Sequence, residues 1–136
     1  MTDRELPLSD EETTVAKLKS IVQKFVSERD WEKFHAPKNL SMALAIEAAE
    51  LMEHFQWLEV EESRNWTADT RRREAVEEEL ADVLSYALAL ALALDLDLSD
   101  ALRRKMRKNE DKYPVAKFRS RFGLEDPREP GTENPS

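Results

Sequence analysis

The sequence predicts an all-helical protein built as a four-helix bundle-type domain. Its 136 residues include only 2 glycines, and it is rich in the good helix formers Ala, Leu, Glu, Lys and Arg. Several segments repeat apolar residues at intervals of three and four, the period of an amphipathic helix. A chain of this length forms one domain. We place that domain at residues 1–114 and expect residues 115–136, which are polar and rich in proline, to form a flexible tail.

The first helix is expected to begin at Ser9, which forms a capping box motif with Glu12, and to end near Arg29. Apolar residues recur at helical spacing along it: Val15, Leu18, Ile21, Val22, Phe25 and Val26. Residues 30–38 should form a structured loop, because Pro37 disfavours helix immediately before it.

Three more helices are expected further along the chain. The second runs from about Asn39 to Trp57, and a polar connection follows over residues 60–69. The third runs from Thr70 to about Leu94, and the fourth is capped by Ser99 and continues to Lys112, before Pro114. The second half of the third helix is so apolar that one chain is not expected to cover it. We therefore expect a homo-oligomer that buries the excess surface.

Composition and charge exclude several classes of protein. A formal net charge of -8 disfavours binding to nucleic acid polymers, whose affinity depends on phosphate contacts. The absence of cysteine excludes disulfides and zinc–thiolate sites, and it suits a cytoplasmic protein. The first residues have neither the basic start nor the apolar stretch of a signal peptide. Residues 83–94, the longest apolar stretch, fall short of the ~20 residues that span a bilayer.

Two acidic pairs on the second and third helices indicate the function. Glu47 and Glu50 form one pair, and Glu79 and Asp82 form the other. Residues three apart share a helix face, and these faces should point into the bundle. Converging carboxylates would repel one another and raise each other's pKa, and a hard cation would relieve both effects. The residue pattern alone leaves a second interpretation open, in which these residues are solvated helix formers.

The ligand types narrow the identity of the metal. Di-iron bundles use Glu-x-x-His motifs, but His54 lies four residues after Glu50 and the third helix has no histidine. Oxygen ligands without sulfur favour Mg²⁺, with Mn²⁺ as the alternative. Mg²⁺ that is held by carboxylates usually also binds a phosphate, so the pattern implies a phosphoryl substrate.

The fourth helix carries candidate phosphate ligands. Lys105, Asn109 and Lys112 share one face, and Tyr113 follows them. A solvated basic stripe would give the same spacing, so this interpretation also stays open.

Tryptophans are candidate stacking platforms for a nucleobase. Trp31 and Trp57 lie at the ends of predicted elements, and Trp66 lies in the polar connection. The alternative is that they are core or interface residues, which is the commoner role of tryptophan.

The segments IEAAELMEHFQW and EEELADVLSY carry a Glu-x-x-Glu … Glu-x-x-Asp signature. They resemble the MazG-like, all-alpha nucleoside triphosphate pyrophosphatases, in the branch that includes the dCTP pyrophosphatases. The upstream ERDWEKFHAPKNLSMAL and the downstream KMRKNEDKYP are similar to the same branch, so the resemblance extends from about Leu18 to Pro114.

This resemblance implies a Mg²⁺-dependent enzyme of MazG-like fold that assembles as a homodimer or homotetramer. It would convert a (d)NTP and water to the (d)NMP and pyrophosphate, acting on dCTP or modified pyrimidine deoxynucleotides in nucleotide pool sanitation. Motif matching assigns the metal ligands to Glu47, Glu50, Glu79 and Asp82, the phosphate ligands to Lys105, Asn109, Lys112 and Tyr113, and the base-binding residues to Trp31, Trp57, His35 and Asn39.

Two further expectations follow. Glu47 or Glu50 is the expected catalytic residue that orients or deprotonates water. Val22 stands where the animal dCTP pyrophosphatases carry a histidine, so recognition of the base is expected to differ. The alternative function is a helical protein–protein adaptor without catalysis, whose acidic residues face water.

Overall fold

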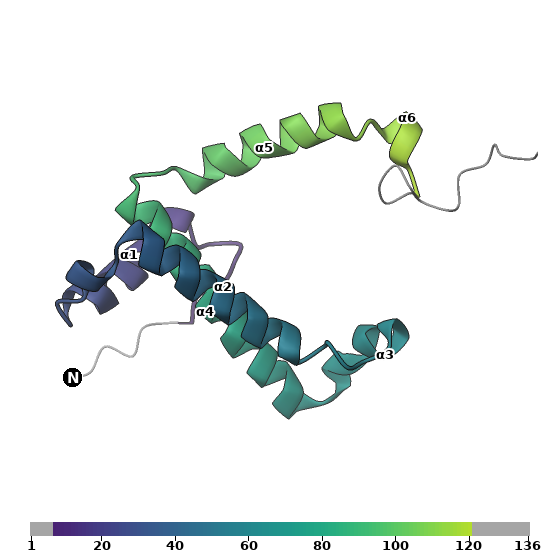
Figure 1. The fold of residues 1–136 in the computed structure, drawn as a ribbon, viewed down its shortest axis with the longest axis horizontal. Helices are drawn as coiled ribbons and strands as arrows, with labels where there is room; N and C mark the ends of the chain where they lie inside the picture. The colour runs from purple at the N-terminus through teal and green to yellow at the C-terminus, as the bar shows by residue number, and fades with distance from the viewer. Residues whose placement is uncertain (1–6, 121–136) are drawn as a thin grey trace, which may run out of the picture. The chain divides into compact units, whose positions relative to one another are not determined.

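The computed structural model describes residues 7–120, and every regular element in that range is a helix (Figure 1). The prediction of an all-helical fold is confirmed. The chain divides into two compact units, one ending at Asp97 and the other beginning at Leu98. No helix within residues 7–120 has both the length and the hydropathy of a membrane-spanning segment.

Helix α1 comprises Val15–Ser27, so the predicted start at Ser9 is wrong. Thr14 is the N-cap, and its Oγ1 accepts a hydrogen bond from the Lys17 N–H at 3.1 Å. The carbonyl of Ser9 instead accepts from the N–H groups of Glu12 and Thr13, which makes a separate turn. Ser9 and Thr14 are both suitable N-cap residues, and Thr14, which directly precedes the apolar run, is the one that caps the helix.

A Schellman motif ends α1 and positions the next segment. Asp30 adopts the left-handed conformation with φ of 52°, and its N–H donates to the Ser27 carbonyl at 3.1 Å. The N–H of Trp31 reaches back to the Val26 carbonyl, also at 3.1 Å. The 3₁₀-helix η1, Glu32–Phe34, follows at once inside the region predicted as a loop. Trp31 is therefore held at the end of α1.

Helices α2 (Pro37–Glu53) and α4 (Thr70–Ala93) lie side by side and form the main packed pair of the first unit (Figure 1). Helix α2 begins two residues earlier than predicted, because proline is well suited to the first turn of a helix. It also ends before Trp57, which lies in the turn that follows. The predicted bounds of the third helix agree with α4 to within one residue.

The core of the first unit is small and is formed by α1, α2, α4 and the connection before α4. Its buried apolar residues are Val26, Leu40, Trp66, Leu88, Ala89 and Ala91. Leu40 is the most completely buried large side chain, with 2% of its surface exposed. Helix α1 packs on α4.

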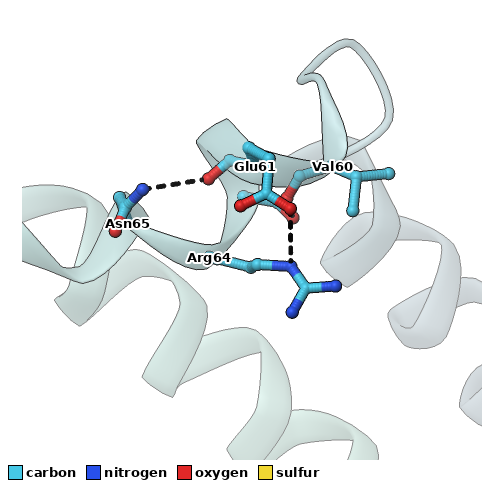
Figure 2. A network of polar contacts seen from close by, with 5 residues as sticks. Val60, Glu61, Arg64 and Asn65 are labelled. Carbon is cyan, nitrogen blue, oxygen red and sulfur yellow. Dashed lines mark hydrogen bonds and ion pairs between the residues drawn. The ribbon is translucent and has the colours of Figure 1, made fainter.

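The connection predicted as polar contains α3 (Val60–Arg64) and the 3₁₀-helix η2 (Trp66–Ala68). Figure 2 shows how local polar contacts hold α3: the Arg64 Nε lies 3.3 Å from the Glu61 Oε1, and the Asn65 Nδ2 donates to the Glu61 carbonyl at 3.2 Å. Trp66 is buried and its ring lies 4.9 Å from that of Phe55. The connection is thus anchored to the segment that follows α2.

A second Schellman motif ends α4. Asp95 has φ of 51°, and the Leu96 N–H donates to the Ala91 carbonyl at 2.9 Å. The Lys19 Nζ donates to the Leu96 carbonyl at 2.6 Å, which links α1 to the end of α4.

The second unit contains α5 (Leu98–Lys112) and α6 (Val115–Phe118). Helix α5 begins at Leu98, one residue before Ser99. The prediction that Ser99 caps this helix is therefore wrong. The short helix α6 occupies part of the segment predicted as a flexible tail, and the ring of Tyr113 contacts that of Phe118 edge-on at 5.1 Å. Residues 121–136 of the predicted tail lie outside the described residues.

Candidate metal centre and adjoining cavity

Three of the four predicted metal ligands gather between α2 and α4. Glu47 and Glu50 project from one face of α2, Glu79 projects from α4, and each offers an oxygen within 4.8 Å of the other two. We call these three residues the acidic cluster. Asp82, the fourth predicted ligand, does not belong to this group and is exposed. Its side chain is one methylene shorter than that of glutamate, but its charge still acts on Glu47 and Glu79.

Burial and mutual repulsion oppose ionisation of the carboxylates in the acidic cluster. Burial, followed by the neighbouring carboxylate of Glu50 and the charge of Asp82, raises the pKa of Glu47 to about 7. Burial and the charge of Glu50 also raise the pKa of Glu79. The Oε2 atoms of Glu47 and Glu79 are buried and have no hydrogen-bond partner among the described residues. Buried polar atoms normally have partners, and a divalent cation is the natural one for carboxylate oxygens. The residues present therefore fit a hard metal ion.

A cavity of about 450 Å³ opens beside the acidic cluster; we call it the first cavity. Glu47 and Asp82 line it, and the apolar face of α1 contributes Val22 and Phe25 to its wall. Anionic groups are thus combined with an apolar wall, which suits a ligand with a charged part and a flat organic part.

Two of the four predicted base-binding residues line the first cavity. Trp31 is 42% exposed and packs edge-on against Phe25 at 5.8 Å between ring centroids, and His35 is half-buried. Trp57 is 87% exposed and is not among the lining residues. Asn39 is not among them either, and its Nδ2 donates to the Phe34 carbonyl at 3.4 Å. Of the two tryptophans, only Trp31 lines this cavity, and base binding by Trp57 stays a prediction.

Sequence reasoning missed two polar residues of the first cavity, Ser85 and Tyr86. They follow Asp82 by three and four positions, so helical spacing alone places all three on one face of α4. The Ser85 hydroxyl donates to the Asp82 carbonyl at 2.9 Å. This spacing could have been read from the sequence, and it would have extended the predicted functional face of the third helix by one turn.

The four predicted phosphate ligands lie in the second unit, on α5 and immediately after it. The carbonyl of Asn109 accepts from the Tyr113 N–H at 2.7 Å, and the Lys112 Nζ lies 5.2 Å from the centroid of the Tyr113 ring. Lys105 is exposed. Phosphate binding by these residues stays a prediction.

Comparison with known proteins agrees with the motifs. The model of the MazG-like family matches residues 42–121. The chain is 43% identical over 104 residues to dCTP pyrophosphatase 1 of Bos taurus, covering 76% of this chain and 62% of that protein. It is 42% identical over 109 residues to dCTP pyrophosphatase 1 of Homo sapiens, covering 80% of this chain and 64% of that protein. The chain thus spans less than two thirds of the length of these relatives.

A solved structure shares both fold and sequence with this chain. The crystal structure of a pyrophosphatase from Archaeoglobus fulgidus DSM 4304 superposes with a TM-score of 0.68 at 40% identity, covering 79% of this chain and 99% of that one. The family model, the similar sequences and the similar fold agree, and the chain belongs to the MazG-like family.

Proposed function

We propose that this protein is a Mg²⁺-dependent nucleoside triphosphate pyrophosphohydrolase that converts a (d)NTP and water to the (d)NMP and pyrophosphate. The relatives named dCTP pyrophosphatase support dCTP or a modified pyrimidine deoxynucleotide as the substrate. Removal of such nucleotides from the cellular pool is the corresponding biological role. The lack of cysteine suits a cytoplasmic setting.

The observation that carries the proposal is the acidic cluster, with its two buried and unpartnered carboxylate oxygens. Three ionised carboxylates this close repel one another, so either bound protons or a cation must offset their charge, and a cation leaves all three ionised. Glu47, Glu50 and Glu79 would hold Mg²⁺, with Asp82 at the edge of the site and Mn²⁺ as the alternative metal. When bound, the metal supplies positive charge that offsets the charge of the triphosphate.

The chain's own residues account for the remaining chemistry. Glu47 or Glu50 accepts a proton from the attacking water. The oxygen of that water forms a bond to the α-phosphorus, and the bond from this phosphorus to the oxygen bridging the α- and β-phosphates breaks. The electron pair leaves with pyrophosphate, and the new oxygen remains in the monophosphate. Trp31 and His35 border the space in which the nucleoside lies.

We also propose that the protein acts as a homodimer or homotetramer. Helices α2 and α4 expose large apolar side chains at positions that a partner would cover: Met42, Ile46, Met52, Leu80 and Leu84 are each at least 46% exposed. Apolar side chains gathered on two packed helices mark an interaction surface.

A panel of canonical and modified nucleoside triphosphates tests the activity, with pyrophosphate release measured with Mg²⁺ and with EDTA. We expect Mg²⁺-dependent release, which Glu79→Gln should lower by at least about a hundredfold, in line with the loss of one electrostatic group from an active site. Glu78→Gln is the matched control, because Glu78 is an exposed neighbour on the same helix outside the acidic cluster.

Thermal melting separates the enzyme from the adaptor. A hydrolase gains stability from Mg²⁺, and more from Mg²⁺ with a non-hydrolysable triphosphate, whereas an adaptor with solvated carboxylates gains none. Melting curves that are unchanged by Mg²⁺ and nucleotide, together with no pyrophosphate release across the panel, would overturn the proposal.

A further inference from the structure

Two cavities follow one another along α4. The first cavity is lined on this helix by Asp82, Ser85, Tyr86 and Ala89. A second cavity of about 350 Å³, which we call the distal cavity, is lined by Ala89, Leu92 and Ala93 of the same helix. These positions continue one helix face at intervals of three and four.

The two cavities share a wall. Val22, Val26, His35 and Ala89 line both. Three of these four side chains are apolar, and together with the His35 ring they form the wall between the two spaces.

The order of the cavities along α4 predicts the orientation of a bound nucleotide. At 1.5 Å per residue, Ala89 lies about 10 Å along α4 from Asp82, and Ala93 lies about 6 Å further. The proposed metal centre places the phosphates at the Asp82 end. The nucleoside then extends toward Ala89, and the distal cavity lies beyond the edge of the base that is farthest from the phosphates.

The lining of the distal cavity indicates what it could bind. Besides its apolar residues, its lining includes Gln23, Glu32 and His35. The Glu32 Oε1 accepts a hydrogen bond from the Ser27 hydroxyl at 2.5 Å. This bond lowers the pKa of Glu32, so the carboxylate stays ionised. A carboxylate acceptor beside an amide is suited to an ammonium group or another hydrogen-bond donor.

We infer that the distal cavity is a subsite for a substituent on the base, so that the preferred substrates are pyrimidine nucleotides whose base carries a short chain ending in a hydrogen-bond donor. This inference rests on the proposed function and deepens it, since it names the class of modified base. Val22 and Ala89 are then specificity residues, because they line both cavities and larger side chains there would reduce the space in each.

The test compares kcat/KM for dCTP with that for dCTP carrying an aminoalkyl chain on C5 or on N4, and for the hydroxyalkyl counterpart of each. We expect at least one of the aminoalkyl nucleotides to be turned over as efficiently as dCTP or better. Slow turnover of all substituted nucleotides, beside efficient turnover of dCTP, would overturn the inference.

Two variants locate the effect. Ala93 lines the distal cavity and is not among the residues of the first, so Ala93→Leu should fill only the distal cavity. It should lower kcat/KM for the substituted nucleotide about tenfold, as expected for a steric change in an apolar pocket, and that for dCTP less than about twofold. Glu32→Gln should reduce the preference for aminoalkyl over hydroxyalkyl about threefold, the size of a solvent-exposed ion pair.

Equal losses for dCTP and substituted dCTP in Ala93→Leu would contradict the inference. Failure of the proposed function has a different signature, because then the unmodified protein would release no pyrophosphate from any nucleotide.

Discussion

The raised pKa of Glu47 predicts that metal binding releases protons. A carboxylate must be ionised to bind a cation, and Glu47, with a pKa of about 7, is partly protonated at neutral pH. Addition of Mg²⁺ should therefore displace a proton from the acidic cluster into the buffer.

The size of this release follows from the pKa. With a value of about 7, Glu47 is about half protonated at pH 7, about nine-tenths at pH 6 and about one-tenth at pH 8. Binding of Mg²⁺ should release about these fractions of a proton from Glu47 at each pH. Glu79, whose pKa is also raised, adds to the release at the lower pH values.

Isothermal titration calorimetry in buffers of different ionisation enthalpy measures this release. Glu47→Gln removes the titrating group, so it should bind Mg²⁺ more weakly and with less proton release. Glu53→Gln, an exposed residue near the end of α2, should behave like the unmodified protein. Mg²⁺ binding with the same proton count at pH 6 and pH 8 would refute the reasoning, and so would an unchanged count in Glu47→Gln.

Three further predictions concern stability and binding. In EDTA the folded pKa of Glu47 lies above its ordinary value of 4.5, so its contribution to stability is fully present below pH 4.5 and is lost as the pH rises through about 7. Urea midpoints should thus fall between pH 5 and pH 8 more steeply than those of Glu47→Gln, and parallel slopes would contradict this. Leu40→Ala should lower the free energy of unfolding by about 2–5 kcal/mol, because Leu40 is 2% exposed. Urea denaturation measures this loss, and a change below about 1 kcal/mol would mean that Leu40 is not a core residue. Trp57→Ala should raise KM for dCTP more than for inorganic triphosphate, since only dCTP has a base to stack. Equal increases in steady-state assays would remove the stacking role.

Periodic helices with clear end signals could be predicted from the sequence. Thr70 to Leu94 was predictable because its apolar run is long and is bounded by Asp95, whose left-handed conformation ends α4. The start of α1 was not, because Ser9 and Thr14 carry similar cap signals and only the folded chain shows which hydroxyl is used. Local propensities do not resolve such competition.

The acidic cluster, too, could be predicted from the sequence only in part. Spacing alone placed Glu47 and Glu50 on one face, and the packing of α2 against α4 brought Glu79 to them. The position of Asp82 outside this group depends on side-chain length and helix rotation, which the spacing pattern does not contain. Trp57 follows the end of α2, where the direction of the chain is set by a turn rather than by helical period. Helical periodicity therefore could not show whether Trp57 reaches the base-binding site.

Crystals grown with Mn²⁺ and examined by anomalous scattering test the central claim most directly. The account predicts an anomalous peak between α2 and α4 in contact with carboxylate oxygens of Glu47, Glu50 and Glu79, and loss of that peak in Glu79→Gln but not in Glu78→Gln. Saturating Mn²⁺ that leaves no peak there, with the three carboxylates turned toward solvent, would contradict it.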